Sequence, residues 1–152
     1  MGPRPSDRTR LSNRDRRGYR EFMCSWDDVS RIATALPETS EQAGREGLRT
    51  WRVRDKTFVW ERPLRKADYK ALGDAAPDGP ILGAWVPDLG AKEAILADDP
   101  DVFFTTPHFD GYPMVLVRLE RIDEPELTEL VVEAWLDRAP KKVAQAYLDD
   151  VR

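Results

Sequence analysis

The sequence predicts an α+β fold in which helices pack on one mainly antiparallel sheet in two layers. Two observations predict this class. Helical apolar periodicity occurs near the start, in the middle and at the end of residues 25–148, and five short strand-like segments lie between these helical stretches. A sheet with an apolar face needs a second layer to cover it, and the helices supply that layer. The expected order is α-β-β-β-α-β-β-α.

The first helix begins at Ser25, with Asp28 three positions later as the partner in a capping box. Pro37 ends this helix, because the residue before a proline is disfavoured in helical geometry. The polar, Gly-punctuated segment 38–47 is interpreted as a loop. The helix presents one apolar face, with side chains at helical spacing: Val29, Ile32, Ala33 and Leu36.

Residues 49–54 and 57–62 alternate between apolar and polar side chains, which predicts a β-hairpin. Side chains two positions apart in a strand point to the same face of the sheet. Half-buried antiparallel strands show this alternation. The apolar face is therefore expected to hold Trp51 and Val53 from the first strand, and Phe58 and Trp60 from the second.

Three cations surround this hairpin. Arg52 and Arg54 point away from the apolar face, and Lys56 lies at the turn. They could contact phosphates, or they could belong to an ordinary solvated face on which Asp55 and Glu61 offer local partners. Both interpretations stay open at this point.

Residues 63–80 form an excursion from the sheet, with a short helical turn at 66–72, and are too short to have a core of their own. Beyond this excursion, the apolar pattern predicts strands at 81–86, 102–105 and 114–121 and a short helix at 90–97.

The last long helix begins at Asp123, with Glu126 in a second capping box and Pro125 in the first turn, where proline is tolerated. Pro140 interrupts it, and residues 141–148 resume as a short terminal helix. The buried stripe of the long helix is predicted to be Leu127, Leu130, Val131, Ala134 and Trp135.

Charge divides the chain of 152 residues into two parts. Residues 1–22 hold seven Arg against three acidic residues, a net charge of +4, so the total of −4 leaves −8 for residues 23–152. The first part is predicted to be a disordered arm, because it has too few aliphatic side chains to order itself. It is either a tether to a polyanion or a solvated extension. Residues 23–152 are expected to form a single domain.

Composition also narrows the class of protein. No apolar run reaches the roughly 20 residues that a membrane span needs, and the start of the chain has no apolar signal region. We therefore expect a cytoplasmic protein with no membrane partner. One cysteine, Cys24, and one histidine, His108, do not make a zinc site. No metal or other cofactor is expected, since phosphate-cradle motifs are absent from the sequence.

The most distinctive stretch is Thr105-Thr-Pro-His-Phe-Asp-Gly-Tyr-Pro113, followed by an apolar strand and a helix that carries Ala134-Trp135 and ends in Ala139-Pro-Lys-Lys142. This combination resembles the MmcQ/YjbR family, and the resemblance covers about residues 25 to 145. It implies a two-layer fold that is often grouped with secretion-chaperone-like folds. It also implies a small, non-enzymatic DNA-binding protein whose hairpin loops touch DNA.

Carried over to this sequence, the resemblance makes the 52–56 hairpin and the 105–113 turn the contacting elements. Hydroxyl groups can bind phosphates and an aromatic ring can stack on a base. The expected DNA-contacting residues are Arg52, Arg54, Lys56, Thr105, Thr106, His108, Tyr112, Lys141 and Lys142.

Two other hypotheses stay open. His108 lies near Asp110 and could act in acid–base chemistry, but no nucleophile motif accompanies it, and a lone His in a proline-bounded turn can instead hold the turn by hydrogen bonding. The other is a protein- or peptide-binding module without a nucleic-acid role, in which an uncovered face or edge of the sheet accepts the partner.

Overall fold

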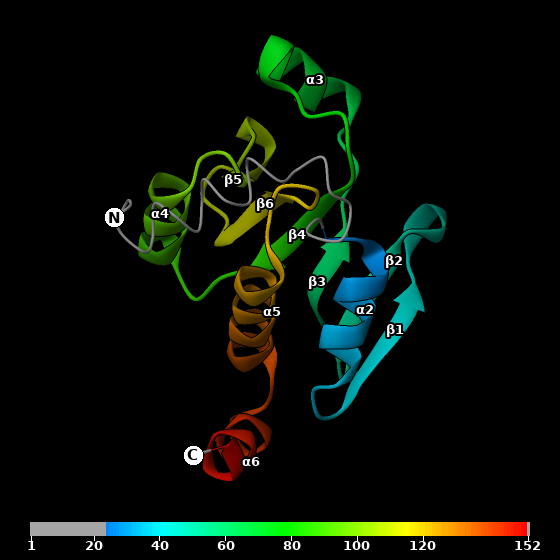
Figure 1. The fold of residues 1–152 in the computed structure, drawn as a ribbon, viewed down its shortest axis with the longest axis vertical. Coiled ribbons are helices and arrows are strands. Elements are labelled where there is room, and N and C mark those ends of the chain that lie inside the picture. Colours follow the sequence, from blue (N-terminus) through cyan, green and yellow to red (C-terminus); the bar gives the residue numbers. More distant parts are fainter. Residues whose placement is uncertain (1–23, 152) are drawn as a thin grey trace, which may run out of the picture.

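The computed structural model describes residues 24–151 and is drawn in Figure 1. The arm expected at residues 1–22 lies outside these residues, and the bounds of the domain predicted at 23–152 stay a prediction. The helices are α2 (Trp26–Thr34), α3 (Lys66–Leu72), α4 (Leu89–Asp98), α5 (Glu124–Arg138) and α6 (Lys141–Val151), and the strands are β1 (Thr39–Ala43), β2 (Arg49–Val53), β3 (Lys56–Glu61), β4 (Ile81–Trp85), β5 (Phe103–Phe104) and β6 (Met114–Arg118).

The strands form one six-stranded sheet in the order β1-β2-β3-β4-β6-β5, and every neighbouring pair is antiparallel. The α+β class with helices on one antiparallel sheet is therefore confirmed. The sheet order places the β2–β3 hairpin in one half of the sheet and the β5–β6 connection at the opposite edge. The hairpin turn and the 105–113 turn, which were both expected to contact DNA, are therefore separated in space.

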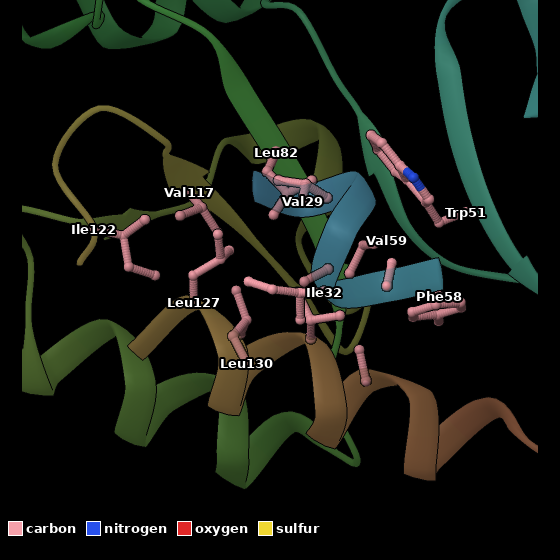
Figure 2. Packing of buried hydrophobic residues seen from close by; sticks show 14 of the residues in the cluster. Val29, Ile32, Trp51, Phe58, Val59, Leu82, Val117, Ile122, Leu127 and Leu130 are labelled. Carbon is pink, nitrogen blue, oxygen red and sulfur yellow. The ribbon is translucent and has the colours of Figure 1, made fainter. Parts of the chain in front are cut away.

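The main core lies between the sheet and the helices α2 and α5. Figure 2 shows apolar side chains of both helices gathered over the sheet. Local signals placed these helices correctly, since Ser25 and Asp28 form the capping box of α2 and the Asp123 carboxylate accepts a hydrogen bond from the Glu126 backbone N–H at 2.9 Å. The five residues predicted for the buried stripe of α5 are all buried: Leu127, Leu130, Val131, Ala134 and Trp135.

The segment 38–47, expected to be a loop, contains β1 instead. Thr39 pairs with Val53 and Ala43 pairs with Arg49 along the outer edge of the sheet. This strand has no large apolar side chain, and much of it is exposed to solvent. A polar edge strand has no apolar alternation, so the pattern that reveals other strands is missing here. This segment is a strand because its backbone pairs with β2.

The prediction that Phe58 and Trp60 share one face is wrong, because β3 contains a bulge. Trp51 pairs with Val59 and Arg52 pairs with Thr57, so Phe58 is an extra residue between them. A bulge of this kind reverses the facing of the residues beyond it. Phe58 therefore joins the core under the helices together with Val59, and Trp60 packs on the opposite face of the sheet.

That opposite face carries a second apolar cluster. Its buried members come from β4, β5 and β6, and side chains from the α3 region and the β5–β6 connection pack against it. The sheet face that the binding-module hypothesis expected to be uncovered is thus covered in part. The buried members are Ile81, Phe104, Met114 and Leu116, with Trp60, Leu64, Leu72, Trp85 and Phe109 packed on them. Among residues 24–151, no helix has the length and apolar character to cross a membrane.

Candidate functional site

The segment 105–113, called here the 105–113 loop, joins β5 to β6 and contains one turn of 3₁₀-helix at Pro107–Phe109. Gly111 has a φ of 83°, a left-handed conformation that glycine adopts at little cost. The expected shaped turn is therefore present. Its Phe109 ring packs inward on the second apolar cluster, so this side chain anchors the loop to the sheet.

A lysine on α4 holds the loop from one side. Lys92 is buried, with 6% of its surface exposed. Its Nζ donates hydrogen bonds to the backbone carbonyl oxygens of Phe109 at 2.8 Å and Tyr112 at 2.9 Å. Burial lowers the pKa of Lys92, and the nearby negative charge of Asp110 opposes that shift. The ammonium group thereby fixes the spacing of two carbonyl groups in the loop.

A buried ion pair holds the loop from the other side. The guanidinium group of Arg62 lies 3.0 Å from the carboxylate of Asp68 on α3 and 5.0 Å from the centre of the Phe109 ring. Burial alone would raise the pKa of Asp68, but hydrogen bonding to the Arg65 backbone N–H and the charge of Arg62 together lower it. The charged form of this carboxylate is therefore the form that the fold stabilises.

The contacts with Lys92 and with the Arg62–Asp68 pair determine which side chains of the loop are exposed to solvent. His108 is exposed, and Tyr112 is 54% exposed. Thr106 is only 1% exposed and the Thr105 hydroxyl is buried, so the surface of the loop does not present these two hydroxyl groups. The loop thus displays one imidazole ring and one phenol ring on a fixed backbone.

The sequence offered His108 as a residue that could hold the turn by hydrogen bonding. In the structure, the side chain that donates hydrogen bonds to the loop backbone is Lys92. Within the described residues, the His108 ring makes an edge contact with Phe109, at 4.7 Å between ring centres, and no hydrogen bond. Cys24 is buried, and burial together with nearby carboxylates raises its pKa to about 12. A thiol with that pKa is protonated at neutral pH and is a poor nucleophile.

The β2–β3 hairpin has a different environment. Arg54 lies in the turn with a φ of 52°, and its Nε donates to the Glu38 carboxylate at 2.5 Å. Arg52 is half-buried and its Nε donates to the Thr50 hydroxyl at 3.3 Å. Lys56 is exposed at the start of β3. Arg52 and Arg54 therefore bind neighbouring side chains, and Lys56 is the most accessible cation of the hairpin.

A chain of contacts places α6 at the same end of the molecule as this turn. Pro37, next to Glu38, accepts a hydrogen bond at its carbonyl oxygen from the Trp135 Nε1 of α5 at 3.0 Å. Trp135 in turn packs edge-on against Tyr147 of α6, with 5.1 Å between ring centres. Lys141 and Lys142 are exposed at the start of α6.

The nine predicted contact residues thus fall into two groups. Figure 1 shows α6 at the far end of α5, away from β5 and β6, which flank the 105–113 loop. The first group is the loop, with Thr105, Thr106, His108 and Tyr112. The second group, called here the basic end, is Arg52, Arg54, Lys56, Lys141 and Lys142.

Sequence reasoning missed three residues that build the site: Lys92, Arg62 and Asp68. A signal existed for the first of them. Lys92 lies three and four positions before Ile95 and Leu96, which both pack on the core, so it occupies the apolar face of α4. A charged residue in such a position indicates a buried partner. Between residues 24 and 151, no three His, Cys, Asp or Glu side chains are grouped so that they could hold a metal ion.

Comparison with known proteins identifies a family, two relatives and a similar solved structure. The model of the YjbR family matches residues 34–136. Uncharacterized protein Rv2570 of Mycobacterium tuberculosis and Uncharacterized protein Mb2600 of Mycobacterium bovis are each 54% identical over 129 residues, covering 83% of this chain and 97% of the relative. The crystal structure of Deinococcus radiodurans protein DR2400, a DUF419 domain, is similar with a TM-score of 0.55 at 18% identity, covering 75% of this chain and 78% of that one.

Proposed function

The chain belongs to the YjbR family, and from this premise we propose that it is a small, non-enzymatic DNA-binding protein that contacts phosphates through its basic end. The observation that carries the proposal is the placement of exposed Lys56 on the same end of the molecule as exposed Lys141 and Lys142. Three flexible ammonium groups that are not buried can each meet a backbone phosphate without any rearrangement of the fold.

The overall charge limits how this binding works. Residues 23–152 carry a net charge of −8, which repels a polyanion at long range. Contacts at the basic end must therefore act at short range, and a few phosphate contacts give weak binding that depends steeply on salt. We expect no strong sequence preference, because contacts to phosphates carry no information about bases.

The hairpin part of the basic end is tested with Arg52→Ala combined with Arg54→Ala. The double variant should bind labelled duplex DNA more weakly than the unaltered chain and show a flatter dependence on salt. Arg54 also pairs with Glu38 at 2.5 Å, an exposed ion pair of modest strength. Unchanged affinity and slope in the double variant would remove the hairpin from the interface.

A second candidate function is protein binding at the 105–113 loop. The observation that favours it is the exposed Tyr112 ring on a backbone fixed by Lys92. Binding residues are commonly carried on loops that a rigid scaffold positions, and tyrosine is frequent among residues that dominate interface energies.

Pulldown of partner proteins before and after nuclease treatment separates the two functions. Partners that survive nuclease and are lost in Tyr112→Ala support the protein-binding function. Partners that nuclease removes support the DNA-binding function.

A further inference from the structure

A groove of about 500 Å³ runs between α4 and α5, outside both groups of predicted contact residues. Its floor is apolar and includes Trp85, Ala91, Ile95 and Leu130. Three of these side chains are only partly buried, so the described residues leave apolar surface open to a ligand. Exposed apolar surface in a concave site commonly marks a place where another segment packs.

The rim of the groove is acidic. Asp98 of α4 and Glu126, Glu129 and Glu133 of α5 line it. At the Trp85 end of the floor, the guanidinium group of Arg138 lies 4.9 Å from the centre of the indole ring. Glu129 and Glu133 are exposed, stand one helical turn apart, and form no ion pair within the described residues. Carboxylates held this close repel one another, and a cationic ligand relieves that repulsion. The groove therefore fits a segment that combines Arg or Lys with a few apolar side chains.

Such a segment precedes the groove in this chain. Residues 1–22, outside the described part of the structure, hold seven Arg against three acidic residues, and their few large apolar side chains include Leu11, Tyr19 and Phe22. Their composition is thus the complement of the groove, cationic and sparsely apolar. A segment that cannot order itself can become ordered on a partner surface.

The described chain begins beside the acidic helix. Cys24 lies close enough to Asp123 and Glu124 for their charges to act on its thiol, and Arg31 of α2 lies 3.2 Å from Glu124. These residues mark the start of α5, the helix that carries three of the four rim carboxylates. An extended chain spans roughly 3.3–3.6 Å per residue, so 22 residues are long enough to lie along α5. A tethered segment also has a high effective concentration at such a site.

We propose that the Arg-rich segment of residues 1–22 docks in the acidic groove between α4 and α5 of its own chain. Arg side chains meet the rim carboxylates, and the apolar side chains cover the floor. In the docked state the segment is withheld from outside polyanions. This inference does not depend on DNA binding at the basic end, which lies elsewhere on the molecule.

The experiment is limited proteolysis of the full chain with trypsin at low salt, with cleavage after each Arg from position 8 to position 20 followed by mass spectrometry. The test variant is Glu129→Gln with Glu133→Gln. The control variant is Glu93→Gln with Asp137→Asn, which removes two exposed charges from the same two helices outside the groove. Thermal unfolding of each chain checks that the fold is retained.

We expect cleavage on the order of fivefold faster in the test variant, because two partly exposed ion pairs of modest strength are lost. The control should be cleaved at the same rate as the unaltered chain. Moderate salt should accelerate cleavage of the unaltered chain and have little effect on the test variant. Equal rates in all three chains would overturn the proposal. Protection that rises with protein concentration would also overturn it, since a second copy would then supply the occupant.

Discussion

Lys92 of α4 donates a hydrogen bond from its Nζ to the backbone carbonyl oxygen of Phe109, 17 positions later in the chain, at 2.8 Å. The same ammonium group also binds the carbonyl oxygen of Tyr112. One buried ammonium group thus ties two carbonyl groups of the 105–113 loop to α4, in addition to the backbone donors that these carbonyl groups already have. This contact holds the backbone that carries the exposed Tyr112 ring.

Replacing Lys92 with Met keeps a long apolar stem and removes the ammonium group. The carbonyl oxygens of Phe109 and Tyr112 keep their backbone donors, the N–H groups of Tyr112 and Met114, but lose the charged donor. A hydrogen bond to a charged group contributes about 1.5–3 kcal/mol. We expect Lys92→Met to lower the free energy of unfolding by about 2 kcal/mol and to speed amide exchange in the loop. Urea denaturation and hydrogen exchange measure the two effects. Lys66→Met, at an exposed position on α3, is the control. Equal stability of the two variants would show that the hydrogen bonds of Lys92 to the loop do not stabilise the fold.

The buried pair of Arg62 and Asp68 gives a pH prediction. The folded protein lowers the pKa of Asp68 below its ordinary value of 3.8, so the stabilisation is complete above that value and is lost as the pH falls through the lower, folded-state pKa. Asp68→Asn leaves the charge of Arg62 buried without a partner, which should cost about 3 kcal/mol at pH 7.

The measurement is the urea midpoint of both chains from pH 7 down to pH 2.5. The difference in stability between them should stay constant down to about pH 4.5 and shrink in more acidic solution. A difference that is the same at every pH would mean that the charge of Asp68 does not contribute.

Gly83 of β4 pairs with Trp60 of β3, and the indole ring covers the glycine. A Cβ atom at position 83 would lie 2.5 Å from the nearest ring carbon. Gly83→Ala should therefore displace a large ring and cost about 1–3 kcal/mol. Gly90→Ala is the matched control, because the added carbon finds its nearest atom 3.4 Å away in Asp88. A thermal-unfolding midpoint that falls equally in both variants would contradict this account of the Trp60 packing.

Local sequence signals predicted the parts of the fold that local physics decides. Ser25 and Asp123 begin their helices through caps that involve residues three positions away, and the first helix ends at Thr34, before Pro37. Strand β1 was not predicted, because its side chains are polar and it is formed by hydrogen bonding to β2. Phe58 changed faces because the register with β2 introduces a bulge, which depends on another strand as well.

The site was less predictable than the fold, because its anchors are charged residues whose partners belong to other elements of the fold. Lys92 of α4 binds Tyr112, 20 positions later, and Asp68 of α3 pairs with Arg62, which follows β3. Charged side chains are normally exposed, so composition alone does not distinguish these three buried residues from surface charges.

The central claim is DNA binding through the basic end, and fluorescence polarisation of a labelled duplex against the full chain tests it most directly. The comparison is between the unaltered chain and Lys56→Gln combined with Lys141→Gln and Lys142→Gln, over a range of low to moderate salt. Residues 1–22 are the same in both chains, so any difference arises in the folded part. Three lost phosphate contacts should lower the slope of log K against log salt by about 2 to 3. Identical affinities and slopes in the two chains would contradict the claim.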